Sequence, residues 1–272
     1  PYNDSSYLNV NGASQLVISF ILICSLSHIF LSNTQQKIIK RLKTEREIRV
    51  ALIIILSVFA FLCVWKLFIY TFSQGGFLSL DKFAEEMGAG LFTIISFITT
   101  SGFFTASAEK VISEIGGSVP FLILVGLSTI GGGVATTSGG IKLIRIYTLY
   151  KHGKHELSKL SHPRSVSSYS SSHRQISHEG AFYAWIFLMV FTFTGGLLIL
   201  ILSFFGIEFK NAVAISLSML STTGPLAPVI LDDFSYGSLS QIVKVCLAIA
   251  MIISRFEILV FISLLNFSAW ER

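Results

Sequence analysis

The chain has 272 residues, of which 52% are hydrophobic and 13% are charged, and its formal net charge is +5. Soluble domains carry about 25% charged residues, so this composition, with a mean hydropathy of +0.72, excludes an ordinary soluble domain. Twenty-four phenylalanines and several apolar runs of bilayer length indicate a helical membrane protein. The three cysteines (Cys24, Cys63 and Cys246) lie in apolar segments without metal-ligand spacing, which predicts neither a metal site nor a disulfide framework.

Apolar segments of two lengths follow one another along the chain. Five are long enough to cross a bilayer: 14–31, 48–72, 118–150, 181–205 and 238–268. Two shorter ones, 83–98 and 207–221, have about 15 residues each. As helices they would reach about 22 Å, less than the hydrocarbon core of ~30 Å. We therefore predict five membrane spans and two re-entrant half-helices; the alternative for the short segments is amphipathic helices on the membrane surface.

The charges of the connecting loops predict one orientation. Two loops hold most of the basic residues, six between Lys37 and Arg49 and seven between Lys142 and Arg174. The positive-inside rule places both loops in the cytoplasm, so the chain starts outside and its C-terminus is cytoplasmic. The other loops carry mainly acids, and an acidic outer vestibule would concentrate cations. Because the basic loops adjoin membrane helices, we expect the lipid bilayer as a partner and no nucleic acid.

One short motif occurs twice, each time at the outer end of a short apolar segment. Residues 96–102 (motif 1) read S-F-I-T-T-S-G, and residues 218–224 (motif 2) read S-M-L-S-T-T-G. Glycine can adopt positive φ, so consecutive carbonyls at such a site can turn toward one axis, and rings of carbonyls replace the hydration shell of an ion. The duplication therefore predicts a pore for a monovalent cation, whereas a single copy would more simply end a helix.

The two motifs belong to two similar units. Residues 47–163 and 178–272 each consist of a span, a short segment, the motif and a second span, and a Ser-rich cytoplasmic linker at 164–177 separates them. Residues 1–46 look like the last span and cytoplasmic linker of a preceding unit. Because the chain begins at Pro1 without an initiator methionine, we expect it to be the C-terminal part of a longer protein.

Five motifs occur in a fixed order along the chain. They are T-T-S-G-F (Thr99–Phe103), G-G-G-V-A-T-T-S-G-G-I-K (Gly131–Lys142), H-P-R-S-V (His162–Val166), S-T-T-G-P (Ser221–Pro225) and S-R-F-E-I (Ser254–Ile258). Together they resemble the TrkH/TrkG/KtrB family of potassium uptake proteins. This resemblance implies an all-α membrane protein in which four M1–P–M2 repeats, like those of potassium channels and with re-entrant pore helices, surround one pore. Residues 1–46 would then end the second repeat, and 47–163 and 178–272 would be the third and fourth.

The two motifs, each with the residue that follows it, are the expected ion selectivity filter. The filter residues are Thr100, Ser101, Gly102, Phe103, Thr222, Thr223, Gly224 and Pro225. K⁺ is expected at Thr100, Gly102, Thr222 and Gly224. Preference for K⁺ over Na⁺ follows only from the resemblance, since one glycine per repeat, without T-V-G-Y-G, indicates a shorter and less exacting filter than that of dedicated potassium channels.

The segment Gly131–Lys142 (the glycine loop) interrupts a predicted span with five glycines and three hydroxyl residues. Gly costs roughly 1 kcal/mol relative to Ala inside a helix, which predicts a non-helical insert or a weak hinge. The resemblance implies an intramembrane gate beneath the filter, made by Gly131, Gly132, Gly133, Thr136, Thr137, Ser138, Gly139, Gly140 and Lys142. The alternative is close helix packing through small residues, although packing faces recur every four residues.

One basic residue, Arg255, lies near the middle of the last predicted span. A charge at that depth is expensive and functional by default, and the resemblance implies a pore arginine below the filter; the alternative is a structural tie between helices. Lys66 and Lys244 lie nearer the outer ends of their spans, where snorkelling suffices, and we expect no role for them. The chain departs from the family pattern at three positions, Ala135, Ser254 and Leu226.

These features predict a potassium transport subunit of a bacterial inner membrane, with K⁺ as the transported ion, no bound organic cofactor and no enzymatic activity. The resemblance also implies a homodimer and a cytosolic nucleotide-binding regulatory subunit like TrkA or KtrA. With two of four filter segments, residues 1–272 are expected not to conduct alone. The main alternative is a cation-coupled secondary transporter with broken helices, which predicts inverted repeats. An intramembrane enzyme built on Ser138 would need a catalytic partner that is not evident in the sequence.

Overall fold

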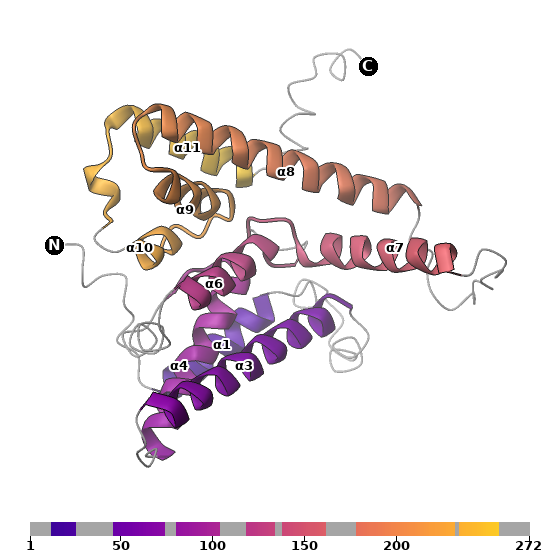
Figure 1. The fold of residues 1–272 in the computed structure, drawn as a ribbon, viewed down its shortest axis with the longest axis vertical. Coiled ribbons are helices and arrows are strands. Elements are labelled where there is room, and N and C mark those ends of the chain that lie inside the picture. Colours follow the sequence, from indigo (N-terminus) through magenta and orange to yellow (C-terminus); the bar gives the residue numbers. More distant parts are fainter. Residues whose placement is uncertain are drawn as a thin grey trace.

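The computed structural model describes residues 12–25, 46–73, 80–103, 118–133, 138–161, 178–231 and 234–255. Every regular element in these ranges is helical, which confirms the predicted all-α class. The helices are α1 (Gly12–Ser25), α3 (Arg46–Ser73), α4 (Leu80–Ile98), α6 (Ser118–Ile130), α7 (Leu143–Ser161), α8 (His178–Phe204), α9 (Phe209–Leu220), α10 (Leu226–Ile230), the short 3-10 turn η3 (Tyr236–Ser238) and α11 (Gln241–Arg255). Figure 1 shows two groups, with α1, α3, α4 and α6 in one, and α8, α9, α10 and α11 in the other. α7 leads from the first group to the second and packs against α8.

Among the described residues, two helices, α3 and α8, are long and apolar enough to cross a membrane. Their apolar stretches, Glu47–Phe68 and Gly180–Phe204, contain 22 and 25 residues, or about 33 and 37 Å of helix. Few of these residues are buried, and large apolar ones such as Ile53 and Phe193 are exposed. A core helix of a soluble protein would be mostly buried, so the two helices agree with the predicted spans 48–72 and 181–205.

The shorter apolar helices α4 and α9 are enclosed by other helices toward their C-terminal ends. Phe92, Ile95 and Ile98 of α4 are at most 1% exposed, and Ile215 and Leu220 of α9 are at most 3% exposed. A helix that lies on a membrane surface keeps one face toward water. The burial of these side chains therefore favours half-helices inside the protein over amphipathic surface helices.

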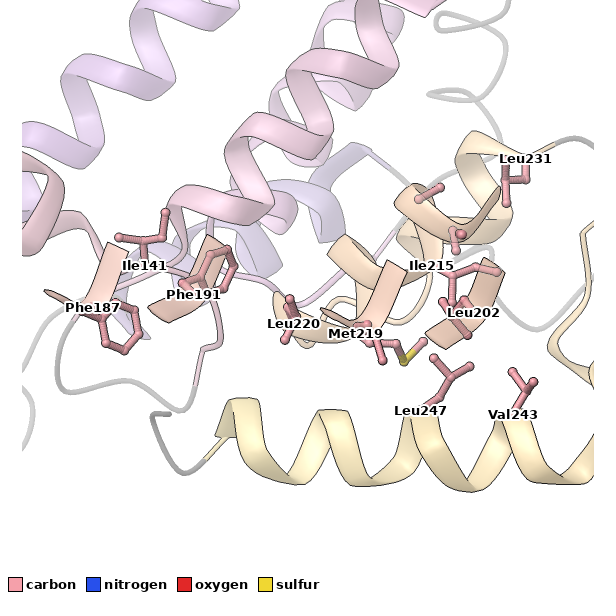
Figure 2. Packing of buried hydrophobic residues seen from close by; sticks show 14 residues of the cluster. Ile141, Phe187, Phe191, Leu202, Ile215, Met219, Leu220, Leu231, Val243 and Leu247 are labelled. Atoms are coloured by element: carbon pink, nitrogen blue, oxygen red, sulfur yellow. The ribbon is translucent and has the colours of Figure 1, made fainter. Parts of the chain in front are cut away.

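Each predicted unit has its own apolar core, and each core is completed by a residue of the other unit. Side chains of α8, α9 and α11 form one cluster, in which Leu202, Ile215 and Leu247 gather (Figure 2). Side chains of α3, α4 and α6 form the other. Ile141 of the glycine loop belongs to the first cluster, and Leu226 of α10, which is fully buried, belongs to the second. The departure from the family pattern at Leu226 thus supplies a side chain that joins the two units.

The predicted span 118–150 is two helices instead of one. α6 ends at Ile130 and α7 begins at Leu143, so the interruption expected at the glycine loop is present. α7 continues beyond residue 150 to Ser161, which makes the second helix longer than the sequence predicted. The polar C-terminal half of α7 carries the basic residues assigned to the cytoplasmic loop, and helix propensity of Lys, Glu and Leu residues there explains the extension.

Several predictions concern residues outside those that the structure describes. They include Ala135, Thr136 and Thr137 of the glycine loop, the H-P-R-S-V motif, the linker 164–177 and the end of the last predicted span beyond Arg255. α11 is described from Gln241 to Arg255 and α1 from Gly12 to Ser25, so both are seen for part of the predicted spans 238–268 and 14–31.

Candidate functional site: two capped half-helices and the glycine loop

Motif 1 forms a tight C-terminal cap on α4. The amide of Thr100 donates to the carbonyl of Phe97 at 3.1 Å, and the amide of Ser101 donates to the carbonyl of Ser96 at 2.9 Å. This pair of bonds is the Schellman pattern, in which the residue after the helix adopts a left-handed conformation. Thr100 is that residue, with φ of 57°.

Motif 2 repeats the cap on α9 bond for bond. The amide of Thr222 donates to Met219 at 3.0 Å, the amide of Thr223 donates to Ser218 at 3.0 Å, and Thr222 has φ of 56°. A β-branched residue at positive φ is a conformational outlier and stores about 1–3 kcal/mol of strain. The sequence predicts positive φ at the motif glycines. Gly102 has it, but in both motifs the left-handed residue that ends the helix is a threonine. The strain at equivalent positions marks both turns as functional candidates.

The two glycines of the motifs are not equivalent. Gly102 has φ of 73°, and a Cβ on it would lie 3.0 Å from Pro225 Cδ and 3.0 Å from Thr223 Cγ2. Gly224 does not have positive φ, and a Cβ on it would meet nothing within 4 Å. Motif 1 and motif 2 therefore lie against each other through Gly102, although the two glycines are 122 positions apart in the sequence. Phe103, the next residue, is exposed.

The glycine loop is docked on the end of α9 directly beside motif 2. The amide of Gly139 donates to Thr222 Oγ1 at 3.0 Å, and the amide of Gly140 donates to the carbonyl of Leu220 at 3.4 Å. A Cβ on Gly139 would lie 2.6 Å from the carbonyl carbon and oxygen of Ser221. Only glycine permits this approach of two backbones.

The two ends of the glycine loop are fastened together. The amide of Ile141 donates to the carbonyl of Thr129 at 2.9 Å, and the amide of Leu143 donates to the carbonyl of Gly132 at 3.2 Å. Gly131 and Gly140 have φ of 72° and 80°, and the chain passes too closely for a side chain at either. Lys142, also at positive φ, is 4% exposed. The described ends of the loop, 131–133 and 138–142, are thus non-helical and fastened to each other, and Gly131, Gly139 and Gly140 permit close approach of the backbone.

The last helix joins the same place through Ser254. Its hydroxyl donates to the carbonyl of Leu220, the acceptor that Gly140 also uses. The sequence singled out Ser254 as a departure from a glycine, and glycine would have no hydroxyl for this bond. Arg255 follows directly and its side chain is exposed, with no ion pair to a residue in the described ranges. The structure therefore places Arg255 next to the junction of α9, α11 and the glycine loop.

Three residues that the sequence interpretation overlooked or set aside also contribute. Lys66 is 7% exposed and forms an ion pair with Glu86 of α4, so the expectation of a snorkelling side chain without a role is wrong. Lys244 donates to the carbonyl of Gly237 at 2.9 Å. Tyr236 donates to the carbonyl of Gly224 at 2.7 Å, and no sequence signal pointed to it. Burial raises the pKa of Tyr236 to about 12.

The motifs contain neutral oxygens, from backbone carbonyls and from hydroxyl groups, at the C-terminal ends of α4 and α9. In the part of the chain that the structure describes, no group of three or more His, Cys, Asp or Glu could hold a metal ion. Such neutral oxygens suit a monovalent cation that exchanges its hydration shell for protein ligands and leaves again. The arrangement is therefore chemically suited to weak coordination of a monovalent cation.

The sequence is similar over nearly its whole length to known cation transport proteins. Residues 10–268 match the TrkH family, described as cation transport protein. The chain is 29% identical to the Trk system potassium uptake protein TrkG of Escherichia coli K12 over 238 residues, 87% of this chain and 45% of that protein. It is 28% identical to the Trk system potassium uptake protein TrkH of Salmonella typhimurium LT2 over 192 residues, 71% of this chain and 38% of that protein.

The fold is similar to the crystal structure of the potassium transporter TrkH from Vibrio parahaemolyticus. The TM-score is 0.76 at 22% sequence identity, and the match covers 97% of this chain and 54% of the other. The chain thus spans about half the length, or less, of the relatives that it matches. The all-helical membrane fold and the family match over nearly the whole sequence lead to one assignment: this chain belongs to the TrkH family of cation transport proteins.

Proposed function

We propose that this chain supplies two filter-bearing units of a potassium uptake pore. The observation that carries the proposal is the meeting of the two motifs: each follows a buried half-helix, each turns at a left-handed Thr, and Gly102 packs against Thr223 and Pro225. Two independent helix terminators would have no reason to share a strained backbone and to lie together. The relatives named as potassium uptake proteins support K⁺ as the ion.

In this proposal K⁺ sheds water at the two motifs and binds near Thr100, Gly102, Thr222 and Gly224. Carbonyl and hydroxyl oxygens replace the hydration shell, while multiple weak sites let the ion leave. Inward movement needs no chemical step of the protein, because the membrane potential supplies about 2.3 kcal/mol per charge per 100 mV. The acidic residues assigned to the outer loops would raise the local concentration of cations.

The glycine loop is the proposed gate. Its second half is held on the filter side by the bonds from Gly139 to Thr222 and from Gly140 to Leu220. Each such bond is worth about 1 kcal/mol net, so a regulatory partner that binds the open form a little more tightly can shift the equilibrium. Arg255, one residue from the Ser254 contact, is proposed to act as a cation barrier at this level.

The family resemblance supplies the setting of this pore. We propose a homodimer in a bacterial inner membrane, with a cytoplasmic C-terminus and a cytosolic nucleotide-binding subunit like TrkA or KtrA. The positive-inside loops support the orientation. The alternative, a coupled secondary transporter, predicts inverted repeats. It is disfavoured because the basic loops give the two units the same orientation, with both half-helices starting and ending on the outer side.

The proposal is tested by uptake of Rb⁺ into liposomes that contain the full-length protein under an imposed potential, with Na⁺ as competitor. Gly102→Ser places a side chain where only glycine fits, so the preference for Rb⁺ over Na⁺ is expected to collapse. Gly196→Ser is the matched control, because a Cβ at Gly196 in α8 would meet nothing within 4 Å. Uptake and preference unchanged by Gly102→Ser would mean that the motif only ends a helix, and the pore would have to be abandoned.

A further inference from the structure

The carbonyls of Thr223 and Gly224 are held by two hydroxyl groups. Tyr236 donates its proton to the carbonyl of Gly224 at 2.7 Å. The hydroxyl of Ser218 lies 2.9 Å from the carbonyl of Thr223, 3.2 Å from that of Gly224 and 3.2 Å from the Tyr236 oxygen. Each hydroxyl has one proton to donate. The shortest distances assign the Ser218 proton to the carbonyl of Thr223 and the Tyr236 proton to the carbonyl of Gly224.

Tyr236 is itself held in place by the turn that carries it. Ser235 begins the turn and accepts a bond from the amide of Gly237, whose carbonyl accepts from Lys244 of α11 at 2.9 Å. The ring of Tyr236 meets that of Phe234 edge to face, with the centroids 5.1 Å apart. The phenol is therefore pinned to the last helix on one side and to motif 2 on the other.

Motif 1 has the same backbone but lacks this support among the described residues. Ser96 occupies the position in motif 1 that Ser218 occupies in motif 2. Its side chain is fully buried, and its hydroxyl oxygen has no hydrogen-bond partner in the part of the chain that is described. Within the described ranges, the two motifs therefore differ in the hydrogen bonds that restrain their carbonyls, although their helix-ending turns are alike.

We propose that Tyr236 is a positioning residue of the filter. Together with Ser218 it keeps the carbonyls of motif 2 from moving inward around an ion, and so disfavours binding of Na⁺ relative to K⁺. The inference rests on the proposed function of motif 2. Na⁺ is smaller than K⁺ and is bound best when the surrounding oxygens move inward. A carbonyl that accepts a hydrogen bond from a fixed phenol resists that movement, yet keeps a second lone pair for an ion. Discrimination then comes from the support behind the filter as well as from the filter oxygens.

Burial of the phenol keeps the donor proton in place under physiological conditions. The pKa of Tyr236 is raised to about 12 by burial, so the hydroxyl remains neutral across the range in which the protein works. The turn that carries Tyr236 lies between α10 and α11, outside the two long apolar spans.

The test is Tyr236→Phe in the full-length protein, assayed by Rb⁺ uptake in liposomes with and without Na⁺. The preference for Rb⁺ over Na⁺ is expected to fall about fivefold, the size expected from the loss of one hydrogen bond, mainly because Na⁺ competes better. Ser218→Ala is expected to lower the preference as well. In the double variant the preference for Rb⁺ over Na⁺ should fall by a smaller factor than the product of the factors of the two single variants, since the two hydroxyls act as one unit. Tyr183→Phe is the matched control, because Tyr183 lies exposed on α8.

The outcomes separate this inference from the proposed function. An equal loss of Rb⁺ and Na⁺ uptake in Tyr236→Phe would assign the phenol to stability alone and overturn the inference. An unchanged preference in Tyr236→Phe, with selective uptake by the unmodified protein, would also overturn it while leaving the pore intact. Absence of Rb⁺ uptake by the unmodified protein would reject the pore, and the inference with it. If Tyr236→Phe does not reach the membrane, Ser218→Ala gives the same decision.

Discussion

The amide of Gly139 donates a hydrogen bond to the side-chain oxygen of Thr222 at 3.0 Å, so the glycine loop is bonded to the residue that makes the left-handed turn of motif 2. The loop and the end of α9 come from different units of the chain. Movement of the loop cannot occur without releasing this bond. This hydrogen bond therefore links the proposed gate of one unit to the proposed filter of the other.

Gly139→Ala tests that link while leaving the sequence of motif 2 unchanged. The new Cβ would lie 2.6 Å from the backbone of Ser221, so the loop must move away from α9. We expect Rb⁺ uptake to rise about fivefold, as for the loss of one hydrogen bond of ~1 kcal/mol, with the preference over Na⁺ retained. Gly126→Ala in α6 is the control, because a Cβ there meets nothing within 4 Å. Slower uptake in Gly139→Ala would show that the loop does not obstruct the path.

The two motif glycines are expected to differ in their tolerance of alanine. Gly102 combines φ of 73° with contacts at 3.0 Å, whereas Gly224 has open space around its missing Cβ. Gly102→Ala should lower the free energy of unfolding by about 1–3 kcal/mol, and Gly224→Ala by less than 1 kcal/mol, roughly the range of a tolerated substitution. Thermal unfolding in detergent measures both. Equal destabilisation would contradict the structural difference between them.

The ion pair between Lys66 and Glu86 predicts a rescue. Lys66→Met leaves a partly buried carboxylate without its partner and should destabilise the protein by roughly 1–3 kcal/mol. Adding Glu86→Gln removes the charge and should restore most of the loss. Thermal unfolding of the two single variants and the double variant measures the coupling. If the double variant is as unstable as the sum of the single ones, the pair contributes no coupling and connects α3 to α4 only by packing.

The raised pKa of Tyr236 predicts how its contribution depends on pH. Burial favours the neutral phenol, with a pKa of about 12 in the folded protein against about 10 in the unfolded chain. Its bond to Gly224 is therefore complete below about pH 10 and is lost as the pH rises through the folded value of about 12. Ion preference measured from about pH 8 to 10.5 should therefore show no titration of Tyr236. A midpoint near the ordinary value of about 10, absent from Tyr236→Phe, would show that burial does not raise the pKa of this phenol.

The hydropathy pattern was sufficient for the class of the protein and for the order of its elements. The long runs that became α3 and α8 and the short runs that became α4 and α9 are distinguished by length alone, because the thickness of the bilayer sets how many apolar residues a span needs. The break in the span after α6 was also predictable, since five glycines close together oppose a helix wherever they occur. These are local properties, so they can be read along the chain.

The contacts that define the site could not be read in this way. Thr100 and Thr222 hold the left-handed turns only because the Schellman bonds and the packing of the motifs outweigh the strain of a β-branched residue at positive φ. Gly139 meets Thr222 across 83 positions of the sequence, and Tyr236 meets the carbonyl of Gly224 through a loop that carries no recognisable signal. The position of Lys66 near the end of its span predicted a snorkelling side chain, whereas in the folded protein it pairs with Glu86 of a neighbouring helix. Such pairings depend on how helices from two units pack, and the free energy of that packing is spread over contacts that no single segment contains.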